Sequence, residues 1–259
     1  MPPIMRMRII DAALDHLGDV GAATRLAAAT ARRMVTPPFE VREVFRQMDR
    51  IGVGSLNLTN ITALFTGLVL AVQTAYTLAA FGARLYIGEV VALSLVRELG
   101  PVLTALMVGG RVGAGITAEI GTMTVTEQVD ALRSMAADPI RKLVAPRAWA
   151  TVVMLPLLTI LADAMGIFGG MLIAVLQEGL TAGFYFQHAF RLLDFQDVAM
   201  GLTKPVLFAY LIAIIACHNG LRARGGADGV GRATTRTVYA SAIGVLVSDF
   251  LITKLFVGL

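Results

Sequence analysis

The chain has 259 residues, of which 56% are hydrophobic and 15% charged. These proportions exclude an ordinary soluble domain and predict that most of the chain is buried in lipid. The single cysteine cannot form an internal disulfide, and the three widely spaced histidines give no zinc-ligand spacing. The net charge is +4, but the basic residues lie between long apolar runs. We therefore interpret the basicity as membrane topology and not as a sign of nucleic-acid binding.

Residues 1–50 form a cytoplasmic or interfacial segment that precedes the apolar part of the chain. Between positions 9 and 20, apolar and charged residues alternate at helical spacing, which predicts an amphipathic helix on the inner leaflet or against a partner. A solvated helical lead-in is the alternative. Pro37 and Pro38 break this helix, and residues 39–48 form a second amphipathic stretch.

Residues 51–259 are predicted to form an all-α integral membrane domain. A hydrocarbon core about 30 Å thick requires about 20 apolar helical residues to cross it. Five stretches qualify, at 64–83, 99–118, 148–177, 205–221 and 237–259. The fold class is therefore five transmembrane helices after an N-terminal interfacial helix.

The distribution of lysine and arginine predicts the orientation of these spans. Sixteen of the 22 basic residues fall within 1–50, 119–147 and 218–237, which alternate with the other connections. Because short cytoplasmic loops carry the excess of lysine and arginine, the N-terminus is expected in the cytoplasm and the C-terminus outside.

The second span is dense in small residues. Gly109 and Gly113 are four residues apart, and Gly110 has the same spacing to Ala114, so one face of the helix lacks bulk. This pattern predicts close helix packing. It leaves open whether the neighbour belongs to the same chain or to a second copy.

A short amphipathic helix is expected directly after this span, at about 124–136. Thr124 and Glu127 have the spacing of a capping box, and Asp138-Pro139 ends the pattern. A loop that only joins two spans would not need so definite a helix. Docking of a cytoplasmic partner is therefore favoured over a passive linker.

Charged residues within or beside the apolar runs are candidates for function, because each is costly in lipid unless it is paired or hydrated. A structural pair of Lys204 with Asp249 is one interpretation, and contact with a polar lipid headgroup is the other. The set comprises Arg97 and Glu98 beside the second span, Arg111 within it, Asp163 within the third, Lys204 at the start of the fourth and Asp249 within the fifth.

The sequence lacks the common motifs for nucleotide binding, hydrolysis and zinc binding. The glycine-rich stretch 225–232 lacks the Lys-Ser/Thr ending of a nucleotide-binding P-loop. Neither a serine-hydrolase elbow nor a zinc-binding pattern occurs. We therefore expect that the chain is not an enzyme and binds no cofactor.

Two stretches resemble the MlaE/YrbE family of ABC-transporter permeases. One is RELGPVLTALMVGGRVGAGITAEIGTMTVTEQVDALRSMAADPIRKLVAPR at 97–147, and the other is LIAIIACHNGLRARGGADGVGRATTRTVYASAIGVLVSDFLIT at 211–253. With PLLTILADAMGIFGG at 156–170, the resemblance covers most of residues 50–259.

The resemblance implies a homodimeric permease in the bacterial inner membrane. A cytoplasmic ABC ATPase dimer, which binds ATP and magnesium, would drive it, often with a small STAS-domain regulator. A periplasmic MCE-domain ring would pass phospholipid to or from the outer membrane and so help to maintain its lipid asymmetry.

The resemblance also implies roles for individual residues. The helix at 124–136 becomes the coupling helix against the ATPase, with Glu119, Thr124, Glu127, Gln128, Asp130 and Arg133 as candidate contacts. Lipid would lie between the two copies near the first, second and fifth spans. The polar end of that cavity is assigned to Arg97, Glu98, Lys204 and Asp249, and acyl-chain contacts to Leu70, Leu78, Phe81 and Leu99.

Two other classes of function are weighed against this one. A secondary transporter for lipids or small molecules, working alone, would need inverted repeats or a line of titratable residues. A membrane-bound lipid-modifying enzyme would need a cluster of histidine, aspartate or cysteine at catalytic spacing. Dependence on a proton gradient without ATP would favour the former, and chemically altered lipid the latter.

Overall fold

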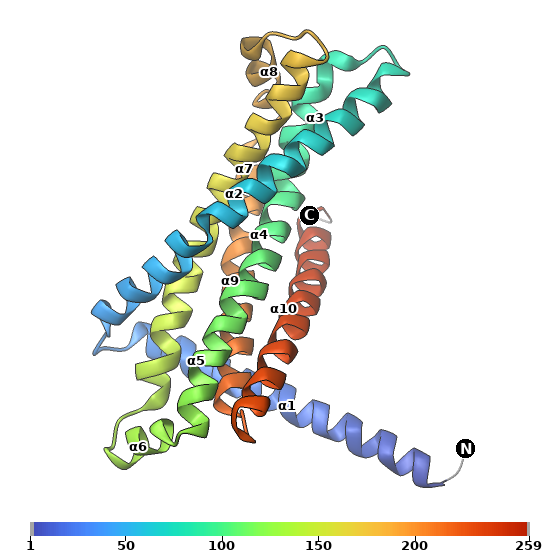
Figure 1. The fold of residues 1–259 in the computed structure, drawn as a ribbon. Helices are drawn as coiled ribbons and strands as arrows, with labels where there is room; N and C mark the ends of the chain where they lie inside the picture. The colour runs from blue at the N-terminus through green and yellow to red at the C-terminus, as the bar shows by residue number, and fades with distance from the viewer. Residues whose placement is uncertain (1–2, 258–259) are drawn as a thin grey trace.

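The computed structural model describes the backbone of residues 3–257 and the side chains of residues 18–256. Within these ranges every regular element is a helix. The helices form an elongated bundle, with the short helix α8 at one end and the short helix α6 at the other (Figure 1). We call these the α8 end and the α6 end.

The N-terminal helix α1 (Pro3–Val35) crosses the α6 end obliquely (Figure 1). It ends just before Pro37-Pro38, as predicted, because proline removes a backbone donor and restricts the residue before it. The amphipathic pattern predicted at 9–20 falls mostly on side chains that lie outside the described residues, which begin at Gly18.

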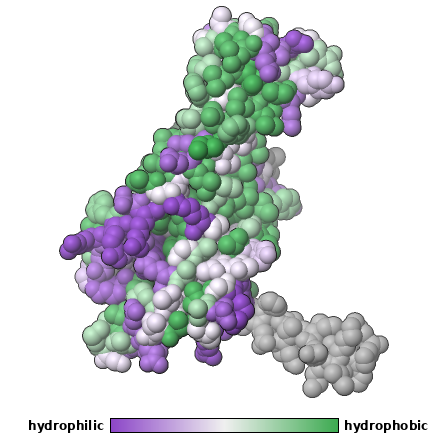
Figure 2. Space-filling model, in the orientation of Figure 1, coloured by the Kyte–Doolittle hydropathy of each residue, from purple (hydrophilic) through white to green (hydrophobic). Residues whose placement is uncertain are grey.

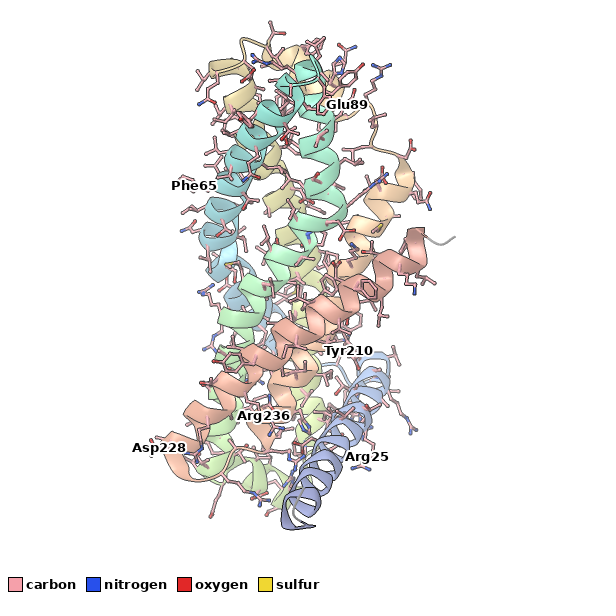
Figure 3. The ribbon with its side chains drawn as sticks, turned by 90° about the vertical axis from the view of Figure 1, so that its right-hand side faces the viewer. Arg25, Phe65, Glu89, Tyr210, Asp228 and Arg236 are labelled. Carbon is pink, nitrogen blue, oxygen red and sulfur yellow. The ribbon has the colours of Figure 1, made fainter. Side chains whose placement is uncertain are left out.

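Side chains from two other helices, α7 and α9, hold the second half of α1 against the bundle. Tyr210 donates its hydroxyl hydrogen to the carbonyl oxygen of Ala27 at 2.5 Å, and Trp149 Nε1 donates to the carbonyl of Met34 at 3.0 Å. Figure 3 shows α1 beside the part of the bundle where Tyr210 lies. This half of α1 is therefore docked on protein.

Helix α2 (Val41–Ala79) contains both the second amphipathic stretch and the first span. It runs without a break through the position between residues 50 and 51, where the sequence pattern places a segment boundary. It packs along α7 (Ala145–Leu176), and this is the most extensive helix contact in the fold. The approach is close at Gly67, where an added Cβ would lie 1.9 Å from the carbonyl oxygen of Gly166.

The second membrane segment is one long helical run, Arg84–Val125, made of six pieces. Its two π-helical turns, η2 (Leu95–Leu99) and η3 (Gly109–Gly113), insert an extra residue into the helical ladder. The other pieces are η1 (Arg84–Tyr86), α3 (Ile87–Ser94), α4 (Gly100–Val108) and α5 (Ala114–Val125). The run begins well before the predicted start at 99, so Arg97 and Glu98 lie inside it and not at its outer end.

The remaining elements complete five helices long and apolar enough to cross a membrane, as predicted. At 1.5 Å per residue the shortest, with 27 residues, extends about 40 Å. These elements are α6 (Gln128–Ser134), η4 (Ile140–Val144), α7, α8 (Ala182–Ala189), α9 (Phe195–Leu221) and α10 (Gly226–Val257).

The surface of the bundle is largely apolar. Hydrophobic residues cover much of its middle and the side toward α8, and hydrophilic residues gather mainly in the half that contains α6 (Figure 2). Phe65 on α2 is 60% exposed and projects outward (Figure 3). Such a surface is stable where lipid replaces water.

Two of the three glycines of η3 pack against other helices of the chain. A Cβ added at Gly109 would lie 3.4 Å from Ser241 Cβ, and one added at Gly113 would lie 3.4 Å from Ile212 Cγ2. These two glycines therefore allow α9 and α10 to approach the second membrane segment. Gly110 faces open space within the described structure.

Candidate functional site

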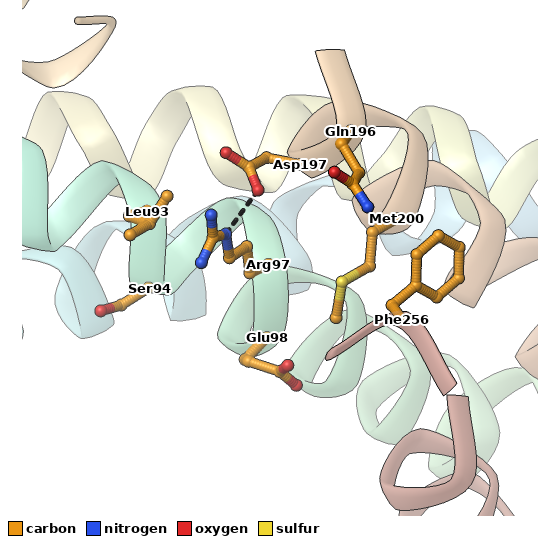
Figure 4. Close-up of a pocket in the computed structure, with 8 residues that line it drawn as sticks. All are labelled: Leu93, Ser94, Arg97, Glu98, Gln196, Asp197, Met200 and Phe256. Atoms are coloured by element: carbon orange, nitrogen blue, oxygen red, sulfur yellow. Dashed lines mark hydrogen bonds and ion pairs between the residues drawn. The ribbon is translucent and has the colours of Figure 1, made fainter. Parts of the chain in front are cut away.

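A cavity of about 410 Å³ opens between the second membrane segment, the start of α9 and the end of α10 (Figure 4). We call it the Arg97 pocket. Most of its lining comes from the π-helical turn η2 and the residues just before it, and from the first two turns of α9. The lining residues are Leu93, Ser94, Arg97, Glu98, Gln196, Asp197, Met200 and Phe256.

Behind this pocket Lys204 is completely buried and joins three helical elements. Its Nζ lies 2.6 Å from Glu98 Oε2 and 2.9 Å from Asp249 Oδ1. It also donates to the carbonyl oxygen of Arg97 at 2.9 Å. A buried ammonium group persists only with such partners, because losing its hydration is costly. The predicted Lys204–Asp249 pair therefore forms, with Glu98 as a third member.

Arg97 is held by an aspartate that the sequence patterns did not single out. Its Nε donates to Asp197 Oδ1 at 2.6 Å, and Asp197 Oδ2 accepts from the backbone N–H of Asp194 at 3.0 Å. The spacing Asp-x-x-Asp before an apolar run is a helix-start signal that could have indicated it. Asp197 is buried, whereas the Arg97 side chain is 44% exposed.

The geometry of the Arg97 pocket suits an anionic or zwitterionic group. Asp197 engages Nε, and the exposed part of the guanidinium group faces the cavity, where it can donate to phosphate oxygens. Glu98 Oε1 accepts a hydrogen bond from Thr253 at 3.1 Å, which fixes its carboxylate beside the same cavity. Positive and negative groups therefore lie side by side at the pocket wall.

An open, mostly apolar groove of about 570 Å³ lies between α2 and the end of η2. It contains two of the predicted acyl-chain contacts, Leu70 and Leu99. The other two lie farther along: Leu78 packs into the hydrophobic cluster near α8, and Phe81 is 79% exposed in the turn after α2. The groove is lined by Ile61, Thr62, Phe65, Thr66, Val69, Leu70, Gln73 and Leu99.

A second candidate site lies at the opposite end, where α6 and the connection from α9 to α10 enclose a polar groove of about 660 Å³. We call it the α6 groove. Six of its lining residues are charged. The lining comprises Thr124, Val125, Glu127, Val129, Asp130, Arg133, Leu221, Arg222, Ala223, Arg224, Gly225, Gly226 and Arg236.

The helix predicted at 124–136 is shorter than expected. Helix α5 continues to Val125, and α6 spans only Gln128–Ser134. The predicted capping box does not form, because Thr124 is still in α5 and donates to the carbonyl of Ile120 at 2.9 Å. Glu127 instead turns the chain between the two helices with a left-handed φ of 62°.

Helix α6 is anchored by one apolar residue and presents polar groups outward. Val129 is buried, and Glu127 and Gln128 are exposed. Asp130 and Arg133 form an exposed ion pair at 2.7 Å. Glu119 lies apart from this set, because its carboxylate contacts other helices at some distance from α6.

Comparisons with known proteins agree with this architecture. The family model described as "Permease MlaE" matches residues 44–255. A "Probable ABC transporter permease protein" of Rickettsia felis is 44% identical over 92% of each chain.

More distant relatives carry more specific names. The "Intermembrane phospholipid transport system permease protein MlaE" of Haemophilus influenzae is 42% identical over 82% of each chain. The chloroplast protein TRIGALACTOSYLDIACYLGLYCEROL 1 of Arabidopsis thaliana is 34% identical over 89% of this chain and 66% of its own. With a match that covers most of its length, this chain belongs to the MlaE permease family.

Proposed function

We propose that the chain is the membrane-spanning subunit of an ATP-driven transporter that moves phospholipids between the inner membrane and a periplasmic MCE-domain partner. In this proposal two copies form the permease, and a separate cytoplasmic ATPase dimer binds ATP and magnesium. The name of the Haemophilus influenzae relative, an intermembrane phospholipid transport permease, supports the choice of substrate. Maintenance of outer-membrane lipid asymmetry would be the physiological result.

The observation that carries the proposal is the course of the second membrane segment, Arg84–Val125. Its π-helical turn η2 supplies Arg97 and Glu98 to the Arg97 pocket, and its last turn leads into α6. A continuous helical segment thus joins a place suited to a lipid headgroup to a polar groove suited to a partner. π-Helical turns in such a segment often mark functional sites.

The mechanism follows from this connection. ATP closes the partner ATPases, and the α6 helices move with them. The motion passes along α5, η3 and α4 to the Arg97 pocket. There the guanidinium group of Arg97 binds the lipid phosphate, and the apolar groove containing Leu70 and Leu99 takes the acyl chains. A change in the pocket then releases lipid toward, or accepts it from, the periplasmic side.

The distribution of charge supports the orientation in this proposal. The α6 groove contains four arginines, Arg133, Arg222, Arg224 and Arg236. The cytoplasmic loops of membrane proteins are rich in arginine and lysine. The α6 end is therefore assigned to the cytoplasm, with the N-terminus, and the C-terminal end of α10 to the periplasm. A small STAS-domain protein bound to the ATPase completes the proposed assembly.

Charge reversal on α6 tests the coupling. We expect Glu127→Lys or Asp130→Lys to abolish ATP-driven lipid transfer in a reconstituted complex, because both residues are exposed in the α6 groove. Binding of phospholipid to the purified permease should be unchanged. Asp49→Lys, at an exposed position on α2, is the matched control. Normal ATP-driven transfer in both α6 variants would refute the proposed docking site.

A further inference from the structure

A second cavity, of about 380 Å³, lies between α2 and the second membrane segment, in the half of the bundle nearer α6. We call it the Arg111 cavity. It is separate from the Arg97 pocket and shares no lining residue with it. Its lining is Gln47, Arg50, Ile51, Arg111, Val112, Gly115, Ile116 and Glu119.

Arg111 lies in the middle of the apolar run 99–118 and is exposed to this cavity. Its Nη1 donates to Ser55 Oγ at 3.0 Å, and no carboxylate of the described residues lies within ion-pair distance of it. The chain leaves room for its guanidinium group, because a Cβ added at Gly54 would lie 2.9 Å from Nη2. A cation at this depth is costly unless an anion or water accompanies it.

The other charged groups at the cavity do not balance Arg111. Arg50 Nη1 lies 3.3 Å from Glu119 Oε1, and the buried Arg147 lies 2.9 Å from Glu119 Oε2. Arg50 and Arg147 therefore share one carboxylate, and Arg111 is paired with none of the described carboxylates. The cavity lining, with Arg50, Arg111 and Glu119, has one positive charge in excess. Guanidinium groups present paired N–H donors that match phosphate oxygens.

Along α2, the cavity lies farther toward α6 than the apolar groove. Ile51 lines the cavity and Ile61 lines the groove. Ten residues of helix extend about 15 Å, which is half the thickness of a hydrocarbon core of about 30 Å. A small gap shares Thr62 and Thr66 with the groove and reaches Met107, one helical turn before Arg111. The arrangement matches a ligand with a phosphate at one end and an acyl chain one leaflet long.

We propose that the Arg111 cavity binds a phosphate group, held by Arg111 and Arg50. The apolar groove farther along α2 favours a phospholipid of the leaflet nearer α6 as its source over inorganic phosphate. The site is additional to the Arg97 pocket, with which it shares no lining residue. It does not depend on an ATPase or on a direction of transport, so it can fail or stand independently of the proposed function.

Photocrosslinking tests the site directly. The full chain is placed in phosphatidylcholine nanodiscs that contain a small fraction of the same lipid with a diazirine beside its phosphate. Crosslinks are expected in peptides that contain residues 50–55 and 111–119. Arg111→Gln should reduce them at least about tenfold, because it removes a charge-assisted hydrogen bond. Arg111→Lys should retain most of them, and Arg42→Gln, at an exposed site on α2, should change nothing.

A steric variant separates loss of binding from loss of folding. A Cβ at Gly115 meets nothing within 4 Å, although Gly115 lines the cavity. Gly115→Leu should therefore fill the cavity without strain, keep every charge and reduce the same crosslinks. Gly183→Leu, at an equally open position on α8, is the matched control.

Binding of radiolabelled inorganic phosphate to the lipid-stripped protein distinguishes the two sources. Crosslinks that depend on Arg111 and Gly115 would support a lipid phosphate. Phosphate binding that Arg111→Gln abolishes, without such crosslinks, would support the phosphate site with a soluble ligand. Wild-type protein that gives neither signal, or gives both unchanged in Arg111→Gln and Gly115→Leu, would overturn the proposal.

Discussion

Lys204 Nζ lies 2.6 Å from Glu98 Oε2, and no part of the Lys204 side chain is exposed. The contact joins α9 to the π-helical turn η2 of the second membrane segment. With Asp249 as its second partner, Lys204 ties α10 to the same point. Three of the five spanning helices thus meet at one ammonium group behind the Arg97 pocket.

Removal of this cation should destabilise the fold. In Lys204→Met, Glu98 and Asp249 would face each other without compensation, and we expect a loss of about 2–3 kcal/mol in the free energy of unfolding. Thermal unfolding of the purified protein measures this loss. Adding Asp249→Asn should recover part of it. Lys254→Met, at an exposed position near the end of α10, should change stability by less than about 0.5 kcal/mol. Equal effects of the two lysine substitutions would contradict this assignment.

Arg97 is proposed to bind the lipid headgroup, whereas Lys204 holds three helices together. Their substitutions should therefore have different effects. Arg97→Gln removes a partly exposed guanidinium group, so we expect phospholipid binding and transfer to fall about tenfold. The unfolding temperature should fall less than in Lys204→Met, because the glutamine amide can still donate a hydrogen bond to Asp197. Asp197→Asn should have a smaller effect of the same kind, because it loosens Arg97 without removing it. Arg84→Gln, which breaks the ion pair of the exposed Arg84 with Glu178 outside the pocket, serves as control. A transfer rate equal to that of the unaltered protein would exclude Arg97 from headgroup binding.

The close contact of α2 with α7 predicts a steric sensitivity. Gly67→Ala would place a methyl group 1.9 Å from the carbonyl oxygen of Gly166, so the helices must separate. We expect a loss of about 1–3 kcal/mol in the free energy of unfolding. Gly110→Ala meets nothing within 4 Å and should be neutral or slightly stabilising, since alanine favours helix. Thermal unfolding of both variants checks the prediction, which fails if Gly67→Ala is as stable as Gly110→Ala.

The docking of α1 on the bundle should depend on pH. The hydrogen bond from Arg236, together with the Arg222 guanidinium group nearby, lowers the pKa of Asp19 below its usual value. A carboxyl with a lowered folded-state pKa stabilises the docked state above about pH 4, and that stabilisation is lost as the pH falls through the folded-state pKa. Because these groups are partly exposed, salt should weaken the effect.

Trp149 provides the measurement, because it is the single tryptophan and donates to the carbonyl oxygen of Met34 in α1. Its emission should stay constant from pH 7 to 5 and shift below about pH 4 as α1 detaches. In Asp19→Asn the emission should lose this acid transition. An identical transition in that variant would assign the acid sensitivity to another group.

The number of spans could be predicted from the sequence, because an apolar run of about 20 residues has few alternatives to a membrane helix. The helix starts could not. Helix α2 begins at Val41 and α9 at Phe195, well before the predicted spans, since polar residues outside the lipid continue the same helices. The same continuation placed Thr124 in α5 and removed the expected capping box.

The charged cluster was predictable in part. Charged residues within or beside apolar runs are costly unless they are paired, and this indicated Arg97, Glu98, Lys204 and Asp249 as candidates. The structure brings all four together. The sequence patterns did not single out Asp197, because it lies in a connection between predicted spans, where charged residues are expected. The partners of Gly109 and Gly113 could not be predicted. A helix face of small residues indicates that another helix packs closely, but it does not identify that helix.

The most direct test of the central claim is isolation of the tagged chain from its native membrane in mild detergent, with mass spectrometry of the proteins and lipids that accompany it. The account predicts a P-loop ATPase, an MCE-domain protein and bound phospholipid. Recovery of the chain without an ATPase, together with lipid transfer driven by a proton gradient alone, would contradict it.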